Sequence, residues 1–148
     1  ISSMQKIATA LGVSLGEFFT AAARGEGGVV VRESERAVLH SWWSSAEVAA
    51  LSTKDNHQLE PVLVTLKPGG RSGKHPYPHP REEFALIVEG RANLTLGPEQ
   101  HSLVAGDAVT ILPGELRLWE NPTPETTRVL IVSIRASSVV RPLPPRAT

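Results

Sequence analysis

Cysteine is absent from this 148-residue sequence. Its absence excludes disulfide scaffolds, thiolate zinc sites, iron–sulfur clusters and cysteine nucleophiles. A basic excess is also lacking, since 15 Lys and Arg balance 15 Asp and Glu, whereas a free-standing nucleic-acid binder would be expected to carry one. The longest apolar runs, such as residues 29–31 and 129–132, are far shorter than the roughly twenty residues of a membrane span. We therefore expect a cytoplasmic protein with no membrane partner, in which these residues alone bind DNA poorly.

Helical patterning is confined to the start of the chain. Met4, Ile7, Ala8 and Leu11 fall on one face of a helix, and residues 14–17 (SLGE) form a capping box for a second short helix. Residues 21–28 (AAARGEGG) are small and Gly-rich, which is typical of a linker. The sequence thus predicts two short helices within 1–20, followed by a linker over 21–28.

From residue 29 onward the sequence consists of short runs rich in β-branched and apolar residues, separated by Pro, Gly, Asn and Asp. The predicted strands are 29–32, 37–43, 61–67, 83–88, 92–96, 101–104, 108–112, 116–120 and 128–135. No helix-length segment separates them, which favours an all-β antiparallel sandwich or closed barrel. We expect a domain over 29–136, a helical turn or loop at 46–51, and an extended Pro-rich tail over 137–148.

The middle of this domain carries a spaced set of Gly, His, Glu, Pro and Asn residues. In order they are Gly69, His75, His79, Glu83, Gly90, Gly106, Asp107, Pro113 and Asn121. Their spacing resembles the two sequence motifs of the cupin superfamily. The resemblance covers about residues 60–135 and implies a small antiparallel β-barrel, also called a double-stranded β-helix or jelly roll, with a metal or ligand site inside. Gly90 and Gly106 fall where the chain must reverse between strands, which favours glycine.

The sequence departs from the cupin pattern at two of the four positions that ligate metal in that family. Tyr77 stands at the first histidine position and Arg117 at the last, so that only His79 and Glu83 remain. One imidazole and one carboxylate hold a divalent ion weakly, and a guanidinium beside them would repel it. His75 is a possible third ligand, but its spacing from His79 aligns both rings only on a helix, which prolines 76, 78 and 80 forbid. We therefore expect no metal and no cofactor.

Two interpretations of the remaining polar residues stay open. In one, Arg117 and Glu83 form a buried ion pair that fills a barrel without a metal site. In the other, strand alternation points these side chains into a cavity that binds an organic ligand. Arg117 then binds a carboxylate of the ligand, and Glu83 accepts a hydrogen bond from an amine or hydroxyl. Tyr77 and Trp119 then supply aromatic walls, and the predicted ligand-binding set is Tyr77, His79, Glu83, Arg117 and Trp119. Such a set suits an amino acid, a short peptide or a polyamine-like molecule.

The opening residues 1–19 (ISSMQKIATALGVSLGEFF) resemble the last two helices of the lambda-repressor-like helix-turn-helix domain of the xenobiotic-response-element (XRE) type, found in many bacterial regulators. In such domains the recognition helix precedes this segment, so the resemblance implies DNA binding through helices upstream of residue 1. The alternative is a short helix pair that merely decorates the barrel. The order of helices, linker and cupin resembles bacterial regulators in which the barrel senses a metabolite.

These resemblances predict the effector-sensing and dimerisation part of a DNA-binding transcription regulator, and not an enzyme. A regulator that reads a palindromic operator must pair. We expect a homodimer through the first strands, 29–43, with the C-terminal strand as the alternative interface. The competing hypothesis is a small metal-dependent cupin enzyme, such as a dioxygenase or isomerase, which needs three or four good metal ligands.

Overall fold

The computed structural model describes residues 29–41, 43–53 and 58–134. The helices predicted within 1–20, the linker 21–28 and the tail 137–148 lie outside the described residues. None of the helices within the described ranges is long and apolar enough to cross a membrane.

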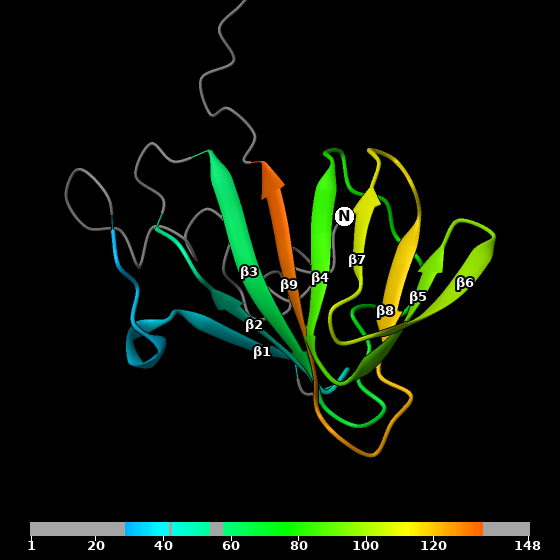
Figure 1. The fold of residues 1–148 in the computed structure, drawn as a ribbon, viewed down its shortest axis with the longest axis horizontal. Coiled ribbons are helices and arrows are strands. Elements are labelled where there is room, and N and C mark those ends of the chain that lie inside the picture. Colours follow the sequence, from blue (N-terminus) through cyan, green and yellow to red (C-terminus); the bar gives the residue numbers. More distant parts are fainter. Residues whose placement is uncertain (1–28, 42, 54–57, 135–148) are drawn as a thin grey trace, which may run out of the picture.

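The described chain forms two antiparallel sheets. Its elements are η1 (Glu33–Glu35), β1 (Val38–Ser41), β2 (Ala46–Ala50), β3 (Leu59–Leu66), β4 (Glu83–Glu89), β5 (Arg91–Leu96), β6 (Glu99–Val104), β7 (Ala108–Ile111), β8 (Arg117–Glu120) and β9 (Thr127–Ile134). The six-stranded sheet has the order β1-β2-β3-β9-β4-β7 and the three-stranded sheet the order β6-β5-β8. In Figure 1, β3, β9 and β4 run side by side through the middle of the molecule, with β1 and β2 on the left and the smaller sheet on the right. The predicted antiparallel all-β architecture is confirmed for the described residues.

Two local predictions are wrong. Residues 29–32 form no strand, and Val30 remains 70% exposed, so this apolar run has neither a pairing partner nor a buried face. Residues 46–51, which the sequence predicts as a helical turn or loop, contain strand β2 at Ala46–Ala50. β2 pairs with β1 on one side and with β3 on the other, where Val48 lies directly opposite Val64. This pairing overrides the preference of the local sequence for a turn or loop.

Alternation along the strands sets the core. On β4 the side chains of Glu83, Ala85 and Ile87 are buried, whereas Phe84 and Val88 are exposed. Because successive side chains on a strand point to opposite faces, each strand contributes one row to the space between the sheets. Most of that space is apolar. Glu83, Arg117 and Ser133 are buried polar residues at the end of the sheet where β4 begins.

Glycines close the turns as predicted. Gly90 has φ +82° and Gly106 has φ +97°, values in the left-handed region that other residues avoid. At Gly90 there is also no space, since a Cβ atom would lie 2.7 Å from the carbonyl oxygen of Thr126. The turn between β4 and β5 therefore requires glycine on two grounds.

Candidate functional site

A buried ion pair joins the two sheets. Glu83 is the first residue of β4 in the larger sheet, and Arg117 is the first residue of β8 in the smaller one. Arg117 Nη1 donates to Glu83 Oε1 at 2.5 Å, and the two side chains are 0% and 5% exposed. Strand alternation predicted that both side chains point inward, and the structure shows that they meet there.

The remaining donors of Arg117 contact the protein backbone. Its Nε and Nη2 donate to the carbonyl oxygen of Glu115 at 3.1 and 2.7 Å, and Nη2 also approaches that of Leu112 at 3.3 Å. The guanidinium is thus held by one carboxylate and two carbonyl groups. A ligand carboxylate would have to compete with these partners for the planar fork.

His79 lies beside the other oxygen of the same carboxylate. Its Nε2 is 3.8 Å from Glu83 Oε2, close enough for charge interaction but too long for a hydrogen bond. His79 Nδ1 lies 3.0 Å from the backbone nitrogen and 3.1 Å from the carbonyl oxygen of Arg81, so Nδ1 contacts the backbone while Nε2 faces Glu83. Among the described residues Glu83 Oε2 accepts no hydrogen bond, which leaves this oxygen and His79 Nε2 as the polar groups offered to a ligand.

Tyr77 is tied to Arg117 through the backbone. The two residues exchange two main-chain hydrogen bonds of 3.0 Å, and Tyr77 is 4% exposed. The Tyr77 hydroxyl donates to Ser72 Oγ at 3.1 Å, and the same oxygen accepts the backbone N–H of Trp119 at 2.9 Å. Ser72 therefore fixes the position of both aromatic residues, a role that the sequence analysis missed.

Trp119 is part of the hydrophobic core and only 1% exposed. It follows Arg117 by two positions on β8, so both side chains point to the same face of the strand. Its indole Nε1 is buried without a hydrogen-bond partner in the described part of the chain. A buried donor of this kind is costly unless water or a ligand satisfies it.

A second residue missed from the sequence is Ser133 of β9. It pairs in register with Glu83 of β4 on one side and with Glu60 of β3 on the other. Its side chain is 2% exposed, and its hydroxyl has no partner among the described residues. Period-two alternation within 128–135 could have placed Ser133 on the inner face, but its neighbours depend on strand register.

The described residues do not fit a metal centre. No three His, Asp or Glu side chains in the described ranges converge on one point, and His75, the possible third ligand, is exposed. Nη1 of Arg117 already occupies one oxygen of Glu83. A divalent ion here would have one imidazole and one shared carboxylate oxygen, with a fixed cation beside them.

A pocket of about 300 Å³ lies near the β1–β2 turn, lined by His40, Ser41, Ser45, Ala46, Glu47 and Lys67. Lys67 follows the end of β3, whereas the register places Glu83 in line with Glu60 near the start of β3. The pocket is therefore at the opposite end of the larger sheet from the buried ion pair.

Comparisons with known proteins agree with this architecture. Residues 62–133 match the family model described as the cupin domain. The chain is 28% identical over 131 residues to the HTH-type transcriptional regulator PuuR of Escherichia coli (strain K12), covering 88% of this chain and 70% of that protein. The predicted cupin fold is confirmed, and distant homology to a transcriptional regulator extends over most of the chain.

Solved cupin structures share the fold at low sequence identity. An RmlC-like cupin from Shewanella frigidimarina NCIMB 400 superposes with a TM-score of 0.62 at 15% identity, covering 76% of this chain and 95% of that one. KdgF from Halomonas sp. gives 0.62 at 18%, covering 75% and 97%. The sugar phosphate isomerase SPO2919 from Silicibacter pomeroyi gives 0.55 at 24%, covering 62% of this chain and 60% of that one. These likenesses support the fold and carry no argument about activity.

Proposed function

We propose that this chain is the effector-sensing and dimerisation part of a cytoplasmic bacterial transcription regulator of the XRE type, and that it is not an enzyme. The observation that carries the proposal is the similarity to an HTH-type transcriptional regulator over 88% of the chain. That similarity spans 131 residues, more than the cupin domain at 62–133. DNA is contacted through a helix-turn-helix at the N-terminal side, and the reading frame upstream of residue 1 should encode its remainder.

The proposed effector site lies around the buried ion pair. Glu83 Oε2 offers an acceptor and His79 Nε2 a second polar group, while the buried side chains of Tyr77 and Trp119 would supply apolar walls. Arg117 supplies a fixed positive charge that a ligand carboxylate can reach by displacing carbonyl partners. The effector class is a small amphoteric metabolite: an amino acid, a short peptide or a polyamine-like molecule.

Effector binding would act by a difference in affinity between two arrangements of the dimer. A ligand that binds one arrangement more tightly shifts the population toward it and so changes the spacing of the DNA-binding heads. No larger rearrangement of the barrel is required.

The test is a thermal-shift screen of amino acids, dipeptides and polyamines, with calorimetry on every compound that stabilises the chain. His79→Ala should weaken binding at least tenfold, whereas the control His40→Ala, which removes an exposed histidine paired with Glu47, should leave it unchanged. For an anionic effector, Arg117→Ala should weaken binding about thirty-fold or more, since losing a buried charge contact costs about 2–5 kcal/mol, and Arg117→Lys should not restore it fully. A ligand indifferent to His79 and Arg117 binds elsewhere and contradicts the proposed site.

Elemental analysis tests the enzyme alternative. About one zinc, iron or nickel per purified chain, lost on His79→Ala, would favour a metal-dependent cupin enzyme over a sensor. The proposal expects no stoichiometric transition metal in the purified chain, because Tyr77 and Arg117 stand at two of the ligand positions.

A further inference from the structure

A pocket of about 300 Å³ lies at the turn between β1 and β2, at the opposite end of the larger sheet from the buried ion pair. Its lining residues are His40, Ser41, Ser45, Ala46, Glu47 and Lys67. Five of these six carry a polar side chain, whereas small-molecule sites are lined mostly by apolar ones. The volume is at the lower limit of such sites, which measure about 300–1,000 Å³. An occupant must therefore be small and must be bound by polar groups.

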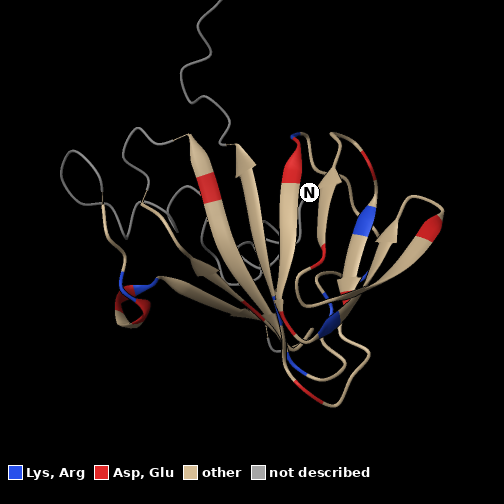
Figure 2. Cartoon of the chain, in the orientation of Figure 1, with Lys and Arg blue, Asp and Glu red and all other residues tan. Residues whose placement is uncertain are grey.

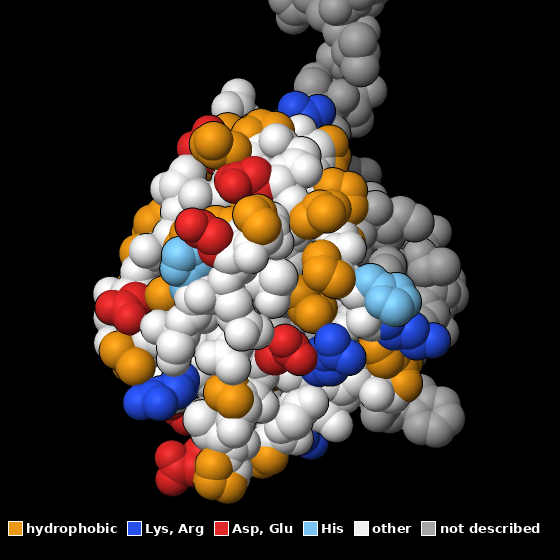
Figure 3. Space-filling view, turned by 90° about the vertical axis from the view of Figure 1, so that its right-hand side faces the viewer, with side chains coloured by type: hydrophobic (Ala, Val, Ile, Leu, Met, Phe, Trp, Pro, Cys, Tyr) orange, Lys and Arg blue, Asp and Glu red, His pale blue; other side chains and the backbone are white. Residues whose placement is uncertain are grey.

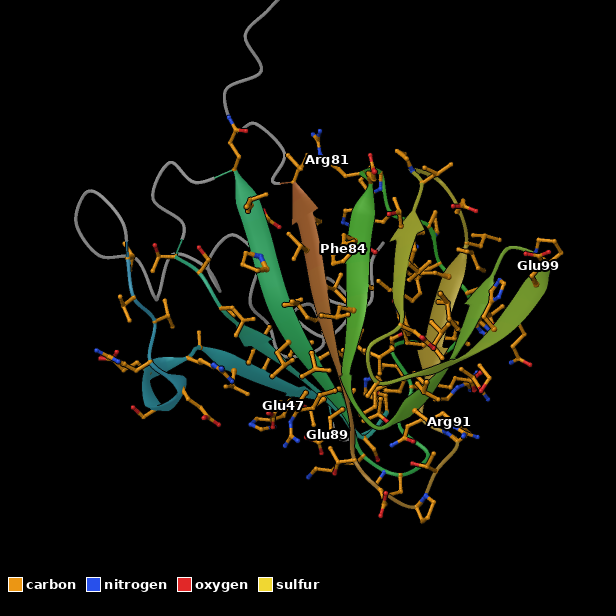
Figure 4. All side chains as sticks on the ribbon, viewed as in Figure 1. Glu47, Arg81, Phe84, Glu89, Arg91 and Glu99 are labelled. Atoms are coloured by element: carbon orange, nitrogen blue, oxygen red, sulfur yellow. The ribbon has the colours of Figure 1, made fainter. Side chains whose placement is uncertain are left out.

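Strand pairing brings a carboxylate and an ammonium group to the same face of the sheet beside this pocket. Glu47 of β2 lies opposite Thr65 of β3. The ladder continues beyond the end of β3, because the N–H of Lys67 donates to the carbonyl oxygen of Ser45 at 3.0 Å. Side chains two positions apart on a strand share a face, so Lys67 lies diagonally across from Glu47. Figure 4 labels Glu47 where the strands of the larger sheet converge.

Both charged groups keep atoms available to a ligand. His40 Nδ1 lies 3.2 Å from Glu47 Oε1, and the two side chains are 69% and 32% exposed. Within the described ranges, Glu47 Oε2 and the ammonium nitrogen of Lys67 have neither a hydrogen bond nor an ion pair. With a neutral His40, a simple anion or cation is attracted by one of these charges and repelled by the other. A molecule that carries both charges is attracted by both.

The chain that joins these two groups is held in a fixed conformation. Ser45 has φ +51°, the one positive value outside glycine among the described residues, and such a residue persists only where its surroundings fix it. Its carbonyl oxygen would lie 2.5 Å from a Cβ atom at Gly70, so only glycine permits this approach. Beside it, Ser44 Oγ donates to the buried Ser41 Oγ at 2.8 Å. A site that is ordered before binding loses less entropy when a ligand enters.

Two other exposed acid–base pairs of the described surface show a different arrangement. In Figure 2, acidic and basic residues gather at the end of the larger sheet where its strands converge. There Arg128 Nη1 and Glu89 Oε1 pair directly at 2.6 Å. Figure 3 views the molecule from the side of β5 and β6, where charged and apolar side chains are interspersed, and where His101 lies 3.4 Å from Glu99. At the pocket, by contrast, an available carboxylate oxygen and an available ammonium group adjoin one cavity.

We propose that this pocket binds a small dipolar molecule that carries one ammonium and one carboxylate group. The ligand's ammonium group donates to Glu47 Oε2, and the ammonium group of Lys67 donates to the ligand's carboxylate. The inference goes beyond the proposed function and does not rest on it, because the pocket and the buried ion pair lie at opposite ends of the larger sheet.

Titration of the isotope-labelled full chain with glycine and with β-alanine, followed by amide NMR, tests the site. The shifts should saturate for at least one of the two probes and be largest at residues 45–47 and 67. Lys67→Met and Glu47→Gln should each raise the dissociation constant about fivefold, the factor for removing one exposed charge contact. Titrations without saturable shifts, or a probe whose affinity is indifferent to both substitutions, would overturn the proposal.

The smaller sheet offers matched control variants. Glu99→Gln removes a carboxylate that also pairs with a histidine, at 3.4 Å, but on β6. Arg91→Met removes an exposed cation on β5. Each control should change the dissociation constant less than about twofold, and a control that weakens binding as much as Lys67→Met would mean that overall charge, and not the pocket, governs binding.

Two analogues of glycine test the class of ligand. Glycine methyl ester lacks the negative charge and N-acetylglycine lacks the positive one, so each should bind about fivefold more weakly than glycine. An analogue that binds as tightly as glycine would contradict recognition of both charges.

The variant His79→Ala separates this site from the proposed effector site. It should leave the affinity for glycine and β-alanine unchanged. A probe that loses affinity with His79→Ala but not with Lys67→Met binds near the buried ion pair, which supports the proposed function and overturns the inference made for the pocket. The opposite pattern supports the pocket, so the two failures are distinguishable.

Discussion

Breaking the ion pair between Glu83 and Arg117 should destabilise the fold far more than breaking an ion pair at the surface. Glu83→Gln keeps the shape of the side chain but removes its charge, which leaves a guanidinium that is 0% exposed without its carboxylate. Removing one partner of a buried pair costs about 3–5 kcal/mol. The backbone carbonyls of Leu112 and Glu115 still accept from Arg117 in this variant, so we expect a loss near the lower limit, about 3 kcal/mol.

The reciprocal change completes a double-mutant cycle. Arg117→Met leaves the buried Glu83 carboxylate without its positive partner and also removes the donor to the carbonyls of Leu112 and Glu115. The free energy of unfolding should therefore fall by about 4–5 kcal/mol. In the double variant neither charge is present, so no buried charge is left without a partner. Its loss should therefore fall short of the sum of the single losses by about 2 kcal/mol or more, within the range for residues in direct contact.

The protein contains a matched control. Arg128 Nη1 lies 2.6 Å from Glu89 Oε1, compared with 2.5 Å in the buried pair, but its side chains are 39% and 53% exposed. Exposed pairs couple by about 0.2–1 kcal/mol because water screens them and the side chains lose entropy. The same cycle with Glu89→Gln and Arg128→Met isolates the effect of burial, since chemistry and distance are nearly constant.

Urea denaturation followed by far-UV circular dichroism provides the free energies of unfolding, and thermal melts should shift by about 4 °C for each kcal/mol. Unchanged m-values would show that the variants unfold from equally compact states. A coupling energy between Glu83 and Arg117 below about 0.5 kcal/mol, or one equal to that of the surface pair, would refute the argument from burial.

Three further substitutions test other parts of the fold by the same unfolding assay. Gly90→Ala should lower the free energy of unfolding by at least about 2 kcal/mol, because the residue has φ +82° and its new Cβ would clash with the backbone. Gly97→Ala should lower it by about 1 kcal/mol, because Gly97 has φ +59° but open space around it, and equal losses would contradict the steric argument. Asn121→Ala removes an amide that donates to two backbone carbonyls and accepts one backbone N–H, so it should lower the free energy of unfolding by about 2–4 kcal/mol. A decrease below about 1 kcal/mol would show that water replaces these hydrogen bonds. Ser72→Ala should cost about 1–3 kcal/mol because it leaves the buried N–H of Trp119 without an acceptor, and an unchanged stability would mean that this hydrogen bond contributes nothing.

Local sequence determined much of the fold. Runs of β-branched and apolar residues located eight of the nine strands, since period-two alternation is a property of each strand alone. Alternation also predicted that Glu83 and Arg117 face inward, and the left-handed glycines at 90 and 106 followed from the need to reverse the chain. These features depend on neighbouring residues only, so the order of residues carries them.

Only the tertiary structure decided which residues meet. Ala46–Ala50 is a strand because β1 and β3 flank it, and no local preference encodes that pairing. Ser133 lies beside Glu83 because of the register between β9 and β4. The carbonyl groups that accept hydrogen bonds from Arg117 belong to Leu112 and Glu115, in the turn between β7 and β8. Strand register and the contact between two sheets join residues far apart in the chain, and their energies depend on all partners at once. The sequence therefore predicted the inward rows, while the assembled sheets determined the neighbours of each side chain within them.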